Sequence, residues 1–360
     1  MKSLAWAVLS FVLAPSGPAA AAERSRWELS DIEVYGTERV APEQLQAKFG
    51  EDFRHMLARW GASSVVARKQ GEDMRAAIER KARELGEFGY SRLEIIDSGV
   101  TEPGAVKGLL LFDFVEKSDM AQRYPFRPEP GKDIKDPSGM LDDWGRYEDA
   151  GRRDTLSAGG DLKRAVCPAY FCPEGIGGEE ENRYEAKFSE RVPGYKQTLL
   201  QILREDRVPS RRAHALYLLT YLHDASDVTA LVSYGLNDPD VSVREAAVTI
   251  LNDIAIHRKD VSVPVRDVMR MLDYPTSSDR QRALALMLSV CDNPDYRSLL
   301  LGPAAEQVLK LLRTKNPGQR QMAHTLLTVL SAEQHAETDY EAWDKWLWRA
   351  RQAATKKGGK

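Results

Sequence analysis

The residues best suited to chemistry in this chain are a charged cluster, several histidines and three cysteines. The cluster comprises Asp238, Asp240, Arg244 and Glu245, which lie within one short stretch. Carboxylates beside a guanidinium can form a polar active site. The same stretch, however, belongs to a pattern with three further copies in the chain. We therefore interpret its charges as part of a repeating scaffold.

The histidines do not form a recognisable catalytic or metal-binding pattern. Four of them fall on or beside predicted helices: His214, His223, His257 and His324. His214 and His324 occupy related helices at positions that differ by roughly 160° around the axis, so they would not line one face. No Ser-His-Asp order, His-x-x-x-His pair or close carboxylate pair stands out in the sequence. We predict no catalytic residue, no cofactor and no metal site.

Two of the cysteines are placed for a short disulfide. Cys167 and Cys172 bracket four residues in a loop-rich stretch, and an oxidising compartment would favour their bond. Free thiols are one alternative. A metal or redox site is another, although neither a second ligand cluster nor the Cys-x-x-Cys spacing is present. Cys291 ends an apolar helix face and is predicted to be a buried core thiol.

Residues 1–22 have the features of an export signal. Lys2 supplies a positive start, residues 4–13 form an apolar run, and residues 20–22 offer a cleavage site of small side chains. The apolar run is shorter than the roughly 20 residues that span a bilayer. A retained membrane anchor is the alternative. We expect a mature protein that is periplasmic or secreted.

Composition and charge describe a soluble protein with no general affinity for nucleic acid. The formal net charge is −3, with 42% apolar and 29% charged residues. A chain of 360 residues is long enough for two domains with separate cores. Residues 351–360 form a basic tail, which we predict to be a solvated, disordered end.

Residues 25–118 predict a small α+β domain with the order β-α-α-β-β. A polar–apolar alternation at 31–34 suits a strand, Pro42 opens a helix, and a second helix is expected at about 72–88. Two strands follow, at 91–96 and 109–115. Because 109–115 is apolar on both faces, interrupted by a single aspartate, we place it in the centre of the sheet.

This domain resembles POTRA domains. The resemblance rests on the order of three short motifs, at 32–40, 85–90 and 112–116, although Thr37 stands where that family usually has Asn. It implies a polypeptide-binding module of the bacterial envelope whose exposed sheet edge accepts an incoming strand. The strand at 91–96 is our candidate edge. Its predicted partner-binding residues are Ser91, Leu93, Glu94 and Ile95.

Residues 119–194 predict a linker rich in proline and glycine. Such a composition favours extended or turning backbone and opposes long helices. The cysteine pair and several aromatic residues would pin this linker to a neighbouring domain. Packing is the favoured role of the aromatic residues over a ligand surface: Tyr124, Phe126, Trp144, Tyr147, Tyr170 and Phe171.

Residues 195–350 predict an all-α solenoid built from helix pairs. A template of Arg, Ala at +3, large apolar residues at +6 and +7 and another at +10 occurs four times, starting at Arg212, Arg244, Arg280 and Arg320. Helix pairs of this period cannot cover their own apolar faces, so stacking would bury them in one continuous core. A final helix at 339–349 carries Trp343, Trp346 and Trp348, which we expect to seal the end of that core. A partner-binding aromatic patch is the alternative.

The second copy is similar to the consensus of HEAT repeats. Asp238-Pro239-Asp240 is followed by Val243, Arg244 and Ala247 at the family's spacing. The resemblance implies that Asp240 and Arg244 bridge adjacent repeats, and by extension so do the template arginines Arg212, Arg280 and Arg320. Some HEAT-like proteins are lyases that attach tetrapyrroles, but no residue here singles out that activity.

Together these features predict an exported, non-enzymatic adaptor or scaffold of the bacterial envelope. It would bind envelope or secreted polypeptides through the sheet edge and the solenoid groove, and would not bind nucleic acid. Peripheral association with a membrane complex is compatible with this role. The alternative is a HEAT-repeat enzyme or a small-ligand-binding protein, with its site in the groove or the linker.

Overall fold

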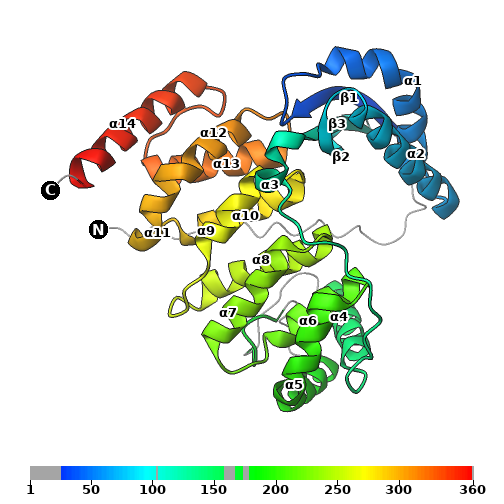
Figure 1. The fold of residues 1–360 in the computed structure, drawn as a ribbon, viewed down its shortest axis with the longest axis vertical. Helices are drawn as coiled ribbons and strands as arrows, with labels where there is room; N and C mark the ends of the chain where they lie inside the picture. Colours follow the sequence, from blue (N-terminus) through cyan, green and yellow to red (C-terminus); the bar gives the residue numbers. More distant parts are fainter. Residues whose placement is uncertain (1–25, 103, 158–166, 173–177, 359–360) are drawn as a thin grey trace.

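The computed structural model describes residues 26–102, 104–157, 167–172 and 178–358, and the predicted export signal at 1–22 lies outside them. Within these ranges, a three-stranded sheet with two helices precedes an all-helical region, as the sequence predicts. The sheet domain packs against the stack of helices (Figure 1). Among the described residues, no helix is both long and apolar enough to span a membrane.

The sheet domain has the predicted order β-α-α-β-β. Its elements are β1 (Arg26–Tyr35), α1 (Pro42–Trp60), α2 (Val65–Arg83), β2 (Phe88–Glu102) and β3 (Ala105–Glu116). The strands lie in the order β1-β3-β2, with β3 parallel to β1 and antiparallel to β2. The nearly all-apolar strand is therefore central, because both of its faces are covered.

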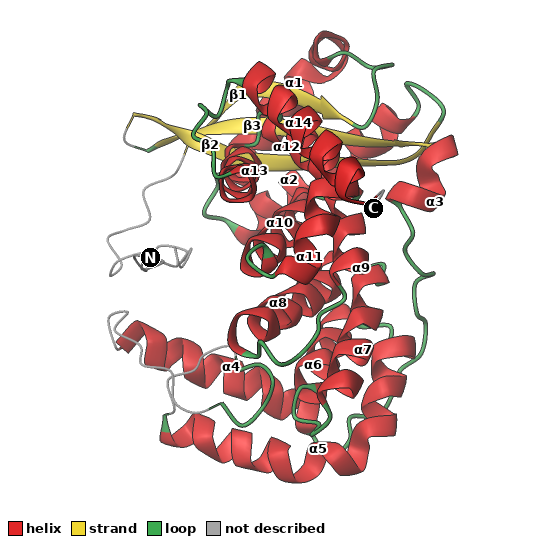
Figure 2. Ribbon diagram, turned by 90° about the vertical axis from the view of Figure 1, so that its left-hand side faces the viewer, coloured by secondary structure: helices red, strands yellow, loops and turns green. Residues whose placement is uncertain are grey.

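The two faces of the sheet pack against different parts of the protein. Phe112 of β3 points towards α1, where its ring centroid lies 5.8 Å from that of Phe53. The next residue, Asp113, points to the opposite face because side chains alternate along a strand. There Asp113 lies between Tyr35 of β1 and Arg92 of β2 in the strand register. This second face is directed at the helical stack (Figure 2).

A connecting strap, residues 117–139, leads from the sheet domain back along the stack. It contains η1 (Lys117–Asp119) and α3 (Met120–Arg123), followed by an extended segment. The backbone N–H of Arg127 donates to the carbonyl of Asn237, and that of Lys132 donates to Glu205, each at 3.0 Å. The strap is therefore bonded to successive turns of the stack, along which it runs towards α4 (Figure 2).

The predicted linker at 119–194 is wrong in its later part, where two long helices lie. These are α4 (Met140–Ser157) and α5 (Glu179–Glu205). Trp144 and Tyr147 of α4 are fully buried and pack on Phe188 of α5, with ring centroids 5.6 and 5.9 Å away. Burying such large aromatic side chains outweighs the low helix propensity of the surrounding glycines and prolines.

The helical stack continues to the end of the described chain. Its further elements are α6 (Pro209–Leu219), α7 (Ala225–Tyr234), η2 (Gly235–Asn237), α8 (Val241–His257), α9 (Val265–Arg270), η3 (Met271–Asp273), α10 (Ser277–Val290), α11 (Pro294–Leu299), η4 (Leu300–Ala304), α12 (Ala305–Leu312), α13 (Pro317–Ser331) and α14 (Tyr340–Gly358). The template helices are α6, α8, α10 and α13. Their apolar residues join one contiguous core that extends from Met140 to Leu347.

The C-terminal helix corrects two expectations. Trp343 and Trp346 are buried and close the core, but Trp348 is 66% exposed, so it does not share that role. Helix α14 continues to Gly358, so most of the predicted disordered tail at 351–360 is helical. Cys291 is buried, as predicted.

Candidate functional site: the arginine ladder and the surfaces around it

Three buried arginines, Arg212, Arg244 and Arg280, connect successive layers of the protein, and we call them the arginine ladder. Arg212 of α6 donates from Nη2 and Nε to the carboxylate of Asp238, at 2.6 and 2.9 Å. Asp238 lies in the turn before α8, so this ion pair joins two repeats. The two parallel bonds compensate for the burial of both charges.

Arg244 of α8 repeats this arrangement one layer further along. It donates to Asp279 of α10 from Nη2 at 2.7 Å and from Nε at 3.0 Å. Its Nη1 donates to the carbonyl of Asp238 at 2.8 Å. Its guanidinium carbon also lies 3.9 Å from the ring centroid of Phe126 in the strap. Burial raises the pKa of the Asp279 carboxyl, and the charge of Arg244 opposes that rise.

Arg280 of α10 takes its carboxylate from the sheet domain. Its Nη1 donates to Asp113 of β3, and also to the carbonyl of Tyr274 at 2.7 Å. Arg123 of α3 donates to the other oxygen of Asp113 at 2.8 Å. A carboxylate from the central strand therefore lies between two guanidiniums. Arg212 and Arg244 each pair with a carboxylate of the neighbouring repeat. For Arg280, Asp113 of the sheet domain takes the role of that carboxylate.

The following template helix contains no acidic residue that could serve Arg280. Asp279 directly precedes Arg280 in α10, whereas Gln319 directly precedes Arg320 in α13. Gln319 is buried and donates to the carbonyl of Ser277 at 3.0 Å. Because α13 supplies no negative charge here, the sheet domain completes the ladder.

The charges at this junction balance one another. Burial pushes the pKa of Arg280 down, but Asp113 and Tyr35 hold it above its ordinary value. The guanidinium carbon of Arg280 lies 4.4 Å from the ring centroid of Tyr35. Burial raises the pKa of Tyr35 to about 12, so its hydroxyl is neutral at physiological pH. Arg123 also lies 3.4 Å from Asp273, which gives two cations and two carboxylates.

Two further carboxylates of the sheet face lie at the starts of template helices. Glu94 of β2 accepts the backbone N–H of Ser277, the first residue of α10, at 3.0 Å. Glu33 of β1 accepts the backbone N–H of Lys315, just before α13, at 2.9 Å. Each carboxylate therefore satisfies an N–H group at the positive end of a helix. These bonds help to fix the sheet domain on α10 and α13.

Strand β2, predicted to bind a partner through Ser91, Leu93, Glu94 and Ile95, lies at an edge of the sheet. Its outward backbone groups at Leu93, however, are already bonded to α2. The N–H of Leu93 donates to the carboxylate of Glu79 in α2 at 2.8 Å, and its carbonyl accepts Arg75 at 3.2 Å. An added strand would have to break both bonds. The prediction of an open edge is therefore wrong at Leu93.

The opposite edge is blocked in the same way. In β1, the N–H of Ile32 donates to the carboxylate of Asp31 at 2.8 Å, and its carbonyl accepts Nζ of Lys315 at 3.2 Å. Side chains that occupy edge groups protect a sheet against unwanted pairing. At Ile32 and Leu93, side chains thus occupy the backbone groups of both sheet edges.

Three residues predicted to bridge repeats, Asp240, Arg280 and Arg320, have other roles. Asp240 caps α8, where its carboxylate accepts the N–H of Ser242 at 2.8 Å; Asp238 forms the inter-repeat bond instead. Arg320 of α13 pairs at 3.1 Å with Glu337, in the connection to α14. It therefore does not continue the ladder. Arg212 and Arg244 do bridge repeats, and Arg280 bridges to the sheet domain.

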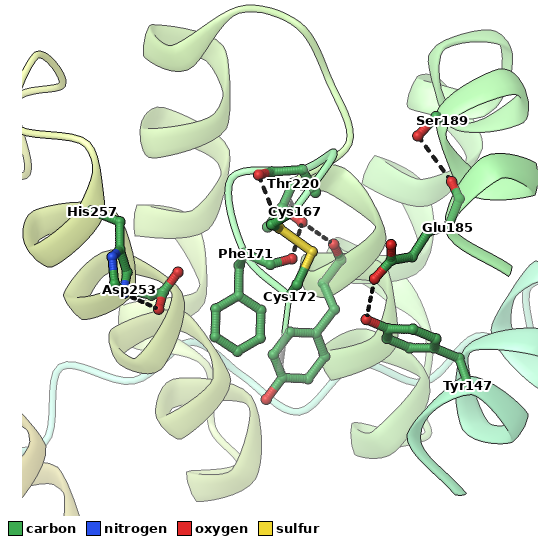
Figure 3. Close-up of a disulfide and its surroundings, with 11 residues drawn as sticks. Tyr147, Cys167, Phe171, Cys172, Glu185, Ser189, Thr220, Asp253 and His257 are labelled. Carbon is green, nitrogen blue, oxygen red and sulfur yellow. Dashed lines mark hydrogen bonds and ion pairs between the residues drawn. A yellow bond between two sulfur atoms is a disulfide. The ribbon is translucent and has the colours of Figure 1, made fainter. Parts of the chain in front are cut away.

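The predicted disulfide between Cys167 and Cys172 is present, with Cα atoms 5.8 Å apart. It closes the loop that holds Phe171 against the stack (Figure 3). The ring of Phe171 stacks on Tyr217 of α6 with centroids 5.4 Å apart, and its carbonyl accepts the hydroxyl of Thr220 at 3.4 Å. The cysteine pair therefore fixes an aromatic side chain on the first repeat.

The histidines predicted to be unrelated are indeed in different surroundings. His214 contacts the carbonyl of Leu141 through Nδ1 at 3.1 Å. His324 contacts the carbonyl of His335 through Nε2 at 2.9 Å and packs edge-on against Trp343. In the part of the chain that the structure describes, no group of three or more His, Cys, Asp or Glu residues is arranged for a metal ion.

Outward-facing residues of the template helices form a shallow hollow of about 270 Å³, which we call the template-helix hollow. Tyr217 of α6, Thr249 of α8 and Arg282 of α10 line it, with Glu148 of α4 at one side. Nη1 of Arg282 donates to Thr249 at 2.9 Å. Of these residues, tyrosine and arginine are types enriched at protein–protein interfaces.

Comparison with known proteins supports the repeat prediction. Residues 222–251 match the family model described as the HEAT repeat associated with sister chromatid cohesion. The matched segment includes α7, the turn with Asp238 and the first part of α8. No curated protein and no solved structure matches the chain. The helical region thus fits HEAT repeats, while the likeness of the sheet domain to POTRA domains stays a prediction.

Replacing the carboxylate at the junction should destabilise the whole chain. We expect Asp113→Ala to lower the free energy of unfolding by about 3–5 kcal/mol, because two buried guanidiniums lose their shared partner. Asp31→Ala removes a half-exposed ion pair with Lys315 and the acceptor of the Ile32 N–H, and should cost only about 1–2 kcal/mol. Urea unfolding of both variants tests this. Equal losses for the two would contradict the role assigned to Asp113.

Glu33 should make stability depend on pH in a defined direction. Burial raises its pKa in the folded state above the ordinary value of 4.5, although the bond from Lys315 opposes the rise. Above the folded pKa, the folded protein must keep a charged carboxylate buried, which lowers the free energy of unfolding. Below pH 4.5 the carboxyl is protonated in both the folded and the unfolded state, so this cost is absent. Glu33→Gln should therefore be relatively more stable near neutral pH than at acidic pH.

The measurement is the difference in urea midpoint between Glu33→Gln and the wild type, followed from pH 7 to below 4.5. Taking the difference cancels the titration of all other groups. The advantage of the variant should shrink as pH falls through the folded pKa of Glu33. A difference that stays constant, or grows as pH falls, would show that burial does not raise this pKa.

Proposed function

We propose that the protein is an exported, non-enzymatic scaffold that binds other proteins through its helical repeats. The observation that carries this proposal is the match of residues 222–251 to a HEAT repeat within a continuous helical stack. HEAT repeats generally mediate protein–protein interactions, since stacking leaves extended surfaces available to partners.

The roles of the charged residues support a binding function over a catalytic one. Asp238 and Arg244 belong to the strongest candidate for chemistry in the sequence, and both are engaged in bonds between repeats. Their side chains are buried and paired. Residues that remain available to a partner lie on outward faces, such as the template-helix hollow.

Export to the periplasm or beyond the cell is supported by two features. The leader-like composition of residues 1–22 is one of them. The other is the disulfide between Cys167 and Cys172, a bond that persists mainly in oxidising compartments. The partners would then be envelope or secreted polypeptides. Because β1 and β2 are blocked at Ile32 and Leu93, we place partner binding on the solenoid instead of the sheet edge.

Site-specific photo-crosslinking in the source cell tests this function. A photoreactive residue replaces Ser242, which lines the template-helix hollow, or Glu72, an exposed control position on α2. We expect adducts with envelope or secreted polypeptides from position 242 and few from position 72, together with loss of residues 1–22 from the mature chain. Adducts only with cytoplasmic proteins, or only from position 72, would contradict the proposal.

A further inference from the structure

A second hollow, of about 750 Å³, lies where the strap, α9 and α12 meet, and we call it the junction hollow. Three cationic side chains line it: Arg266 and Arg270 of α9, and Lys310 of α12. The two arginines are four residues apart and therefore share one face of α9. All three residues are exposed. Its volume is within the usual range for pockets that enclose a ligand.

No ion pair joins any of the three cations to a carboxylate of the described residues; the charge of Lys310 only adds to that of Arg351 in lowering the pKa of Glu306. The carboxylates that also line the junction hollow are already engaged. Asp273 accepts Gln122 at 2.8 Å and Gln307 at 2.5 Å, and it lies beside Arg123. Glu306 pairs with Arg351 at 2.6 Å. The hollow therefore keeps a local excess of positive charge on a protein whose formal net charge is −3.

The lining of the junction hollow is partly apolar. Pro125 of the strap and Met269 of α9 contribute to it, as do two alanines. A lining with both apolar and cationic groups fits a ligand that combines apolar and acidic groups. A short stretch of polypeptide with acidic side chains has this chemistry, and its carboxylates can form charge-assisted bonds with guanidinium groups.

We propose that the junction hollow binds an acidic segment of a partner polypeptide, with Arg266, Arg270 and Lys310 as its contacts. This inference rests on the proposed scaffold function and names the chemistry of one partner. The strap that follows β3 contributes Gln122, which donates to Asp273 at the hollow. Arg123, the next residue, bonds to Asp113, so the docked sheet domain helps to position this part of the lining.

An anionic membrane is a less suitable ligand than a polypeptide. Membrane-surface binding needs a face with large apolar side chains that can enter the lipid. The exposed large apolar residues of the described chain are Val65, Val66, Val100, Ile256 and Trp348. Lining residues of the junction hollow are not among them. A concave site with a few clustered cations fits a narrow acidic chain better than a flat bilayer.

Binding of a fluorescent oligoglutamate peptide of about ten residues to the full chain tests the proposal by anisotropy. Arg270→Glu should weaken binding about tenfold or more, since it replaces attraction by repulsion. Arg270→Lys keeps the charge and should retain most of the affinity. Lys81→Glu makes the same change in net charge on exposed α2 and should leave affinity within about twofold. Equal urea midpoints would exclude unfolding as the cause.

Three outcomes would overturn the proposal. The first is no oligoglutamate binding by the wild type. The second is an equal loss in Arg270→Glu and Lys81→Glu. The third is binding, sensitive to Arg270→Glu, only to phosphatidylcholine vesicles with about 30% phosphatidylglycerol, which would assign the hollow to a membrane. If oligoglutamate fails while position 242 still crosslinks to envelope polypeptides, the scaffold function stands and only this inference is lost.

Discussion

The structure depends on one buried carboxylate, that of Asp113 in the central strand β3. An unpaired charge in such a position would be strongly unfavourable, because burial removes it from water. Here Arg280 comes from the solenoid and Arg123 from the strap, and together they supply bonds to both carboxylate oxygens. Separating the two domains would break the ion pair between Asp113 and Arg280. The buried charges therefore connect the sheet domain to the solenoid.

The arginine ladder extends this principle from α6 to α10. Each of its three arginines bonds to a carboxylate of the next layer, and for Arg280 the next layer is a β-sheet instead of a helix pair. The strap follows the same line, since Phe126 covers Arg244 and the backbone of Arg127 bonds to the turn at Asn237. The buried charges of the ladder mainly hold the layers of the fold together. In the proposed function, partners bind the outward surfaces of the solenoid.

The sequence predicted the features that depend on local pattern. Arg244 and its spaced apolar residues indicated the repeats, and the apolar strand around Phe112 indicated the centre of the sheet. It could not predict which residues meet across long distances. Asp113 was visible only as an interruption of an apolar strand, although a charge in a buried strand is itself a signal that a distant cation must pair with it. The closed edge at Leu93 and the helix around Trp144 likewise depend on contacts with other elements.

The ion pair between Asp113 and Arg280 should make the sheet domain and the solenoid one cooperative unit. Native-state hydrogen exchange of the full chain tests this coupling by comparing wild type with Arg280→Gln. We expect amides of β1 and β3 to lose protection together with those of α10, because opening the junction exposes both parts. Unchanged protection of the strands, with a loss confined to α10, would contradict it.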